Sequence, residues 1–206
     1  MHVSFFTHNF VQKGFYRTMR LAKTTVMFIT LLISVITNAA EPASQAQEVR
    51  AVDFAIKYYM KATPGQPLMR NPVLRENLAQ EITTAARTQE VVIPVALLTT
   101  IVYDESTFDV TAKGKLGEIG LTQVHGEAAK NCDLKDAKGQ LDCGARWLAL
   151  KFQECGTWKG ALTAYASGKG CISKSDRTKT LVDYRLRQWA KLEKEIQSHL
   201  NTEFGG

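Results

Sequence analysis

The first 40 of the 206 residues contain no aspartate or glutamate, and the rest of the chain has no marked excess of either charge. The formal net charge is +6, but four basic side chains lie in the first 40 residues, which leaves 22 basic and 20 acidic side chains in residues 41–206. A protein that binds duplex nucleic acid needs an excess of Lys and Arg on its folded surface, because its affinity comes mainly from neutralised phosphates. The charge balance therefore predicts no nucleic-acid partner.

The sequence also lacks a Cys-x-x-Cys pair, a nearby pair of histidines and a glycine-rich phosphate-binding loop. We therefore expect neither a metal nor a nucleotide cofactor. There is no internal repeat and no low-complexity linker. With 45% hydrophobic residues, the chain has the composition of an ordinary globular protein with room for one domain of average size.

The first 40 residues are predicted to be a secretory signal peptide. Basic residues precede an uncharged, largely apolar run from Thr24 to Ile36, and cleavage is expected after Ala39 or Ala40. The apolar block is well short of the roughly 20 residues that cross a bilayer, which favours a cleaved signal over a membrane anchor. A start at Met19 would give a tighter signal than the first residue. We expect a periplasmic or secreted protein.

The remaining residues are predicted to be mainly α-helical. Apolar spacing, capping residues and prolines indicate helices over residues 48–62, 71–90, 94–106, 140–154, 159–166 and 178–200. The glycine-rich stretch 113–120 is predicted to be a loop, and the only strand candidates are short and lie around residues 117–124. We expect a main domain over residues 91–206 with an N-terminal helical annex at 41–90.

The four cysteines are expected to form two disulfides. An even number of cysteines in an exported protein favours disulfides over a metal site. Three connectivities are possible, and we prefer the sequential pairing because each bond then closes a short local loop. This pairing joins Cys132 to Cys143 and Cys155 to Cys171.

Glu105 is the first candidate catalytic residue. At 100° per residue, Glu105 lies with Ile101 at the centre of the apolar face of its predicted helix. Thr99 and Thr100 face away, and Asp104 lies at the edge, where we expect it to matter far less. Desolvation of a carboxyl group on an apolar face raises its pKa toward the range of a general acid. The alternative is a helix-end glutamate that turns back to water or pairs with a lysine.

Three short motifs follow one another from this glutamate onward: Glu105-Ser-Thr-Phe-Asp109, Gly117-Glu-Ile-Gly-Leu-Thr-Gln123 and Ala164-Tyr-Ala-Ser-Gly168. In order and spacing they resemble the three motifs of the lysozyme-like catalytic domain of soluble lytic transglycosylases. The segment 142–148 is also similar to the helix that precedes the third motif in that family. The resemblance covers residues 91–175.

The resemblance implies a role for four side chains. Glu105 is the catalytic acid and Ser106 is its hydrogen-bonding neighbour. Gln123 contacts the substrate, and Tyr165 is an aromatic residue beside the acid. Together, Ser106, Gln123 and Tyr165 are the expected substrate-binding residues.

The chain departs from the family pattern at two positions. Thr122 stands where Met is usual, and Ala166 replaces the Asn of the third motif, which removes an amide that could bond the sugar or brace the loop. Gly117, Gly120 and Gly168 are expected to serve as turn glycines with positive φ rather than as site residues.

The chemistry that the resemblance implies is cleavage of the β-1,4 bond between N-acetylmuramic acid and N-acetylglucosamine in peptidoglycan glycan strands. One carboxyl group suffices, because the muramyl 6-hydroxyl closes on C1. Candidate partners beyond the glycan are a secretion, conjugation or phage apparatus.

Two other functions remain open at this point. The first is a hydrolysing muramidase, with Asp109, Glu118 or Asp133 as a second carboxylate. The second is a non-catalytic peptidoglycan-binding scaffold, which the loss of the Asn at Ala166 favours. The basic side chains of helix 178–200, Arg185 among them, are interpreted as a solvated face rather than a partner surface.

Overall fold

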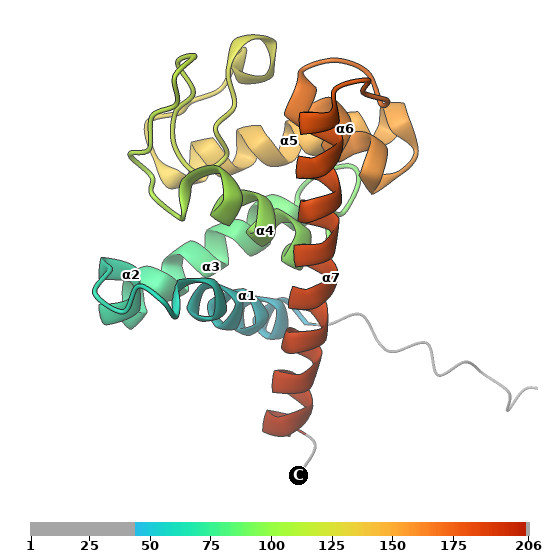
Figure 1. Cartoon of the computed structure of the whole chain (residues 1–206). Helices are drawn as coiled ribbons and strands as arrows, with labels where there is room; N and C mark the ends of the chain where they lie inside the picture. Colours follow the sequence, from blue (N-terminus) through green and yellow to red (C-terminus); the bar gives the residue numbers. More distant parts are fainter. Residues whose placement is uncertain (1–43, 205–206) are drawn as a thin grey trace, which may run out of the picture. The chain divides into compact units, whose positions relative to one another are not determined.

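A computed structural model describes residues 44–204 of the chain (Figure 1). Within this range the protein has seven α-helices, one 3₁₀ helix and no strand. The elements are α1 (Gln45–Met60), α2 (Pro67–Arg70), α3 (Pro72–Arg87), α4 (Val95–Ser106), η1 (Gly126–Ala129), α5 (Ala137–Cys155), α6 (Trp158–Ser167) and α7 (Asp176–Phe204). The mainly α fold class is therefore confirmed. The predicted signal peptide lies outside the described residues.

The predicted helix bounds differ from the observed ones by four residues at most. The start of α3 is typical of the agreement, because the Asn71 side chain accepts hydrogen bonds from the backbone N–H groups of Val73 and Leu74 and Pro72 is the first helical residue. The single turn of α2 was not predicted. In place of the expected short strands there is one isolated bridge, between Lys113 and Ile119.

Helix α4 lies in the interior of the fold and contacts α1, α3 and α7. Thr99 and Thr100, which were predicted to face away from the apolar side, are completely buried. Their hydroxyls donate to the carbonyls of Val95 and Ala96 one turn earlier, and Thr100 also bonds the Tyr59 hydroxyl. The prediction of one exposed face is therefore wrong, because these bonds allow α4 to be buried all round.

The helices before residue 90 share the core with the later ones. Val52 of α1 and Ile82 of α3 are completely buried in the same cluster as Leu97 of α4 and Leu148 of α5. The described residues 44–204 all belong to one compact unit. No helix among residues 44–204 has the length and apolar character needed to span a bilayer.

Helix α7 runs past α6, α4 and α1 in turn (Figure 1). Its buried residues recur every three or four positions, at Val182, Arg185, Leu192 and Ile196, with the partly buried Trp189 between them. This spacing is that of one helix face. Arg185 therefore lies within the apolar stripe that α7 turns toward the core.

The four cysteines form two disulfides, in the preferred pairing. Cys132–Cys143 ties the segment after η1 to α5, and Cys155–Cys171 ties the end of α5 to the loop after α6. The bonds span 11 and 16 residues along the chain. The first bond restrains the segment before α5, and the second restrains the loop after α6, the helix that carries the third motif.

We predict that the purified exported protein has no free thiol and that reduction lowers its melting temperature by about 10 °C or more. Each disulfide limits the unfolded ensemble, which is worth about 3 kcal/mol for loops of this size. Thiol counting under denaturing conditions and thermal melts with and without reductant measure the two effects. Two or more reactive thiols in the exported material would contradict this expectation.

Candidate active site

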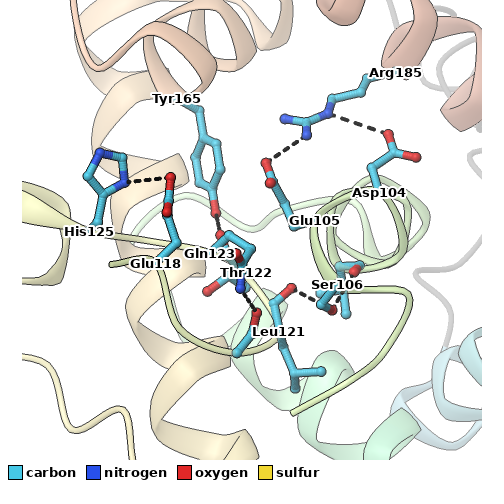
Figure 2. Close-up of polar contacts among 12 residues, drawn as sticks. Asp104, Glu105, Ser106, Glu118, Leu121, Thr122, Gln123, His125, Tyr165 and Arg185 are labelled. Carbon is cyan, nitrogen blue, oxygen red and sulfur yellow. Dashed lines mark hydrogen bonds and ion pairs between the residues drawn. The ribbon is translucent and has the colours of Figure 1, made fainter. Parts of the chain in front are cut away.

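The candidate acid, Glu105, lies in the last turn of α4 and is held there by an arginine from α7. The Arg185 Nη2 atom is 2.6 Å from Glu105 Oε1 (Figure 2). The Glu105 side chain is 22% exposed, whereas that of Arg185 is only 3% exposed. Glu105 therefore extends from a buried helix toward the surface, with its charge balanced from the interior.

Asp104, the preceding residue, is the more deeply buried carboxylate. Its side chain is 8% exposed, and its Oδ2 atom lies 3.4 Å from Arg185 Nε. Burial raises the pKa of the Asp104 carboxyl to about 6, because the loss of hydration disfavours the charged form more than the neighbouring Arg185 favours it. The prediction that Asp104 lies at the edge of the helix face therefore needs correction.

The interpretation of the basic residues of α7 as a solvated face also needs correction. Arg187, Lys191 and Lys194 are exposed, as expected, but Arg185 is buried and pairs with two carboxylates. The sequence signal for this was a single charge within the apolar stripe of α7. Because Glu105 was also predicted to lie on an apolar face, the two opposite charges were candidates for a buried pair.

Tyr165 of α6 lies near Glu105, on the side away from Asp104 (Figure 2). Its hydroxyl donates to the Thr122 carbonyl over 2.7 Å. Burial raises the pKa of the phenol far above its usual range, and the negative charge of Glu105 adds to this shift. The phenol therefore stays protonated and fixes its ring between the acid and the second motif.

Ser106 connects the end of α4 to the second motif. Its Oγ atom lies 2.9 Å from the Val102 carbonyl oxygen and 3.1 Å from that of Leu121, so its one proton is shared between two carbonyls. The contact holds the loop beside the helix turn that carries the acid.

The chain reverses sharply after α4 in a strained conformation that the sequence did not indicate. Thr107 and Phe108 have φ values of 55° and 62°, a region that residues other than glycine rarely adopt. The Phe108 side chain is buried and its ring contacts that of Tyr103. Packing of this ring supports the turn and sets where α4 ends.

The loop of the second motif is closed by its own polar groups. The side-chain amide of Gln123 donates to the carbonyls of Gly120 and Ala112, at 2.8 and 3.3 Å. The backbone N–H of Gly120 also donates to Ala112, and Gly114 donates to the Glu118 carbonyl. Gln123 therefore holds the loop with its NH₂ group, and its φ of 48° shows how tightly the chain turns there.

Glu118 lies in this loop and is held by backbone groups. Its own N–H and that of Leu116 lower the pKa of its carboxyl, and the Leu116 nitrogen lies 2.7 Å from Glu118 Oε2. His125 Nδ1 lies 3.9 Å from Glu118 Oε1 (Figure 2). Glu118 is thus an ionised carboxylate that stabilises the loop.

The other two carboxylates considered earlier also have local partners. Asp109 accepts hydrogen bonds from the backbone N–H and the hydroxyl of Thr111, at 2.8 and 2.7 Å, so it caps the turn after α4 as predicted. Asp133 accepts from the backbone N–H of Lys135 and pairs with its ammonium group.

Sequence reasoning missed Gln140, a buried residue of α5 whose side chain hydrogen bonds the backbone of the second motif. Its Oε1 accepts from the Leu121 N–H at 2.9 Å, and its Nε2 donates to the carbonyls of Val110 and Leu134. At Gly120, which has a φ of 74°, an added Cβ would overlap the Gln140 amide. Glycine is therefore required there both by the turn and by this close approach.

Thr122 is also held by Gln140. Its side chain is completely buried, and its hydroxyl donates to the Gln140 backbone carbonyl over 2.8 Å. It packs against Gly144 of α5, where a Cβ would overlap it. The threonine at the position where the family usually has Met is thus a buried, hydrogen-bonded part of the loop. Ala166 is partly buried on α6, next to Tyr165.

A match to a protein-family model identifies the family of this chain. The family model described as the Transglycosylase SLT domain matches residues 82–186, about half of the chain. The chain belongs to the SLT transglycosylase family. No curated protein and no solved structure matches the chain.

Membership of the SLT family implies a lysozyme-like fold and a peptidoglycan substrate, and the family is generally one of lytic transglycosylases. The matched range contains Glu105, the second-motif loop and Tyr165, and it ends one residue after Arg185. Glu105 and its neighbours Tyr165 and Arg185 therefore all lie within the matched SLT range.

We predict that Gln140→Leu lowers the free energy of unfolding by about 3 kcal/mol or more. Leucine fills a similar volume but leaves the buried Leu121 N–H and two partly buried carbonyls without their partner, and an unpaired buried polar group costs about 1–3 kcal/mol. Denaturant unfolding measures the change. Gln153→Leu, an exposed position on the same helix, is the matched control and should change stability by about 0.5 kcal/mol or less. Equal effects of the two substitutions would contradict the anchoring role of Gln140.

Proposed function

We propose that the protein is an exported lytic transglycosylase that cleaves the β-1,4 bond between N-acetylmuramic acid and N-acetylglucosamine and leaves a 1,6-anhydro-N-acetylmuramic acid end. The observation that carries the proposal is the placement of Glu105. It is a partly exposed carboxylate at the end of a buried helix, beside Tyr165 and the second-motif loop of an SLT domain.

The reaction needs one carboxyl group that acts twice. Protonated Glu105 donates its proton to the glycosidic oxygen, the C1–O bond breaks, and N-acetylglucosamine leaves with a free 4-hydroxyl. The resulting Glu105 carboxylate then accepts the proton of the muramyl 6-hydroxyl as its oxygen bonds C1. No water is consumed, and Glu105 ends protonated, as it began. The 6-hydroxyl competes well with water because it is held next to C1 at a high effective molarity.

Exposure distinguishes Glu105 from Asp104 as the acid. The raised pKa of Asp104 would suit proton donation, but its 8% exposed side chain lies against Arg185 in the interior. Glu105 has the larger exposed fraction and lies on the side of Tyr165. A glycan strand can therefore reach Glu105 without displacing α7.

The surroundings of the other carboxylates support a mechanism with one. Ordinary glycoside hydrolysis places a second carboxylate about 5–9.5 Å from the acid, as a nucleophile or as a base for water. Asp109, Glu118 and Asp133 each hold backbone N–H groups of their own loops. Each is therefore committed to its loop rather than aimed at a water molecule.

We also propose specific roles for the remaining side chains of the site. Gln123 uses its NH₂ group on the loop, and its carbonyl oxygen makes no hydrogen bond within residues 44–204, so it can accept one from a sugar hydroxyl or N–H. Ser106 keeps the loop in place beside the acid, and Tyr165 offers its ring to the sugar. The substrate is the glycan strand of peptidoglycan, either in envelope remodelling or for a secretion, conjugation or phage apparatus.

We predict that Glu105→Gln lowers the rate of release of muropeptides from purified sacculi about 100-fold or more while the protein stays folded. The amide keeps the shape of the side chain and loses only the transferable proton, and a general acid is typically worth 10²–10⁴-fold. Asp109→Asn is the matched control and should retain activity, because it affects only the turn after α4. A folded Glu105→Gln variant with wild-type activity would refute the role of the acid.

We further predict that the released muropeptides end in 1,6-anhydro-N-acetylmuramic acid, one water lighter than hydrolysis products and without a reducible end. Mass analysis before and after borohydride treatment identifies them. Glu118→Gln should give the same product, because that carboxylate serves the loop and not the reacting bond. Reducing-end muramic acid as the main product, together with loss of activity in Glu118→Gln, would instead identify a muramidase with two carboxylates.

A further inference from the structure

Three buried polar atoms beside Glu105 have no hydrogen-bond partner within residues 44–204. Arg185 hydrogen bonds Glu105 through Nη2, but no group in residues 44–204 hydrogen bonds its Nε or Nη1. Asp104 Oδ2 also has no hydrogen-bond partner in this part of the chain, although it lies 3.4 Å from Arg185 Nε. Figure 2 shows the guanidinium group between the two carboxylates. A small rotation would convert the loose contact with Asp104 into a hydrogen-bonded pair.

A hydrogen-bonded pair of Arg185 with Asp104 would keep the charges of the cluster balanced. When both carboxylates are ionised, the group of three carries a net charge of −1 in a largely buried place. When a proton resides on Glu105, as the proposed reaction requires, Arg185 and an ionised Asp104 remain as a neutral pair. A buried cation needs such a partner at every stage, because an unpaired buried charge is strongly unfavourable.

The other titratable groups around this cluster are phenols, which stay neutral. Burial raises the pKa of Tyr59 and of Tyr184, and the negative charge of Asp104 adds to both shifts. Tyr59 from α1 and Tyr184 from α7 face Asp104, and Tyr165 from α6 faces Glu105. Tyr103 of α4 stacks on Tyr59. Tyr59, Tyr165 and Tyr184 therefore stay neutral near pH 7, and the guanidinium keeps its positive charge.

We propose that Asp104 is a positioning residue of the lytic reaction, which takes over Arg185 from Glu105 when Glu105 carries the proton that it delivers to the glycosidic oxygen. The inference rests on the function proposed above. Once Glu105 has given up this proton, Arg185 returns to it and stabilises the carboxylate until the 6-hydroxyl proton arrives. Without Asp104, Arg185 would stay with Glu105 and favour the form that cannot act as an acid.

Two substitutions should move the pH profile of the reaction in opposite directions. Activity needs protonated Glu105, so it falls as pH rises through the pKa of that group. In Asp104→Asn a like charge is lost and Arg185 has Glu105 as its one anionic partner, so the alkaline limb should move to lower pH by about one unit. In Arg185→Gln the opposite charge is lost, so this limb should move to higher pH.

The activity at pH 7 follows from the same shift. On the alkaline limb, a displacement of one unit corresponds to about a tenfold loss of activity for Asp104→Asn. Asp183→Asn, which removes a partly exposed carboxylate of α7 paired with Lys159, is the matched control and should leave both the limb and the activity unchanged. A residue with a merely structural role would lower activity at all pH values without moving the limb.

A direct titration gives a readout that does not depend on activity. Carboxyl NMR of protein labelled with ¹³C-glutamate follows each glutamate, and the signal that disappears in Glu105→Gln belongs to Glu105. Its midpoint should fall in Asp104→Asn, a variant that preserves the shape of the side chain. If Arg185→Gln does not fold, the midpoint in Asp104→Asn decides the matter alone.

The outcomes separate this inference from the proposed function. An unchanged or raised Glu105 midpoint in folded Asp104→Asn would overturn the exchange of Arg185, whatever the products are. Hydrolysis products or no release of muropeptides by the wild-type protein would overturn the proposed function instead. A lowered midpoint together with an alkaline limb displaced in the same direction supports the exchange.

Discussion

The structure around the active site depends on one buried guanidinium group. Arg185 of α7 is buried against α4, where it contacts the two carboxylates at the end of that helix. A buried ion pair adds little net stability compared with an apolar contact, but loss of one partner typically costs about 3–5 kcal/mol. The interaction therefore fixes which position of α7 can lie against α4, and the orientation of the acid follows from the packing of a helix 80 residues further along the chain.

The second-motif loop is positioned by a different kind of interaction. It has almost no regular structure, so its backbone groups need partners from elsewhere. Gln140 supplies them from α5, Ser106 supplies one from α4, and Tyr165 supplies one from α6. The loop that faces the acid is thus attached to three helices by single polar side chains, each of which points inward. A substrate can therefore contact only those groups of the loop that these three side chains do not bind.

Much of this fold could be predicted from local sequence. Asn71-Pro72, Pro94 and the apolar spacing around them mark helix ends, because capping and backbone geometry act within a few residues. The disulfide pairing also followed from short loops. The depth of α4 could not be predicted in this way. Thr99 and Thr100 look like surface residues in the sequence, and they are buried because their hydroxyls bond the preceding turn while other helices cover them.

The residues of the candidate site could be proposed from the sequence, but the side chains that hold them in place could not. Motif order pointed to Glu105 without the structure, because the residue types of a reaction recur at fixed spacing. Arg185 and Gln140 act across 80 and 19 residues of chain, so no local pattern reveals their partners. A charge within an apolar helix stripe is the one general signal for such a residue. It marks a side chain whose burial must be balanced by an opposite charge, and Glu105 on its own apolar face was the complementary signal.

Neighbouring positions on a helix have different surroundings, and this geometry explains why two adjacent carboxylates differ in burial. Successive side chains diverge by about 100°, so a single arginine placed between them can contact both while their other surroundings differ. Asp104 lies at greater depth, where burial raises its pKa, and Glu105 lies toward Tyr165 and the surface. Both carboxylates contact the same guanidinium group, so Arg185 links two side chains that otherwise lie in different surroundings.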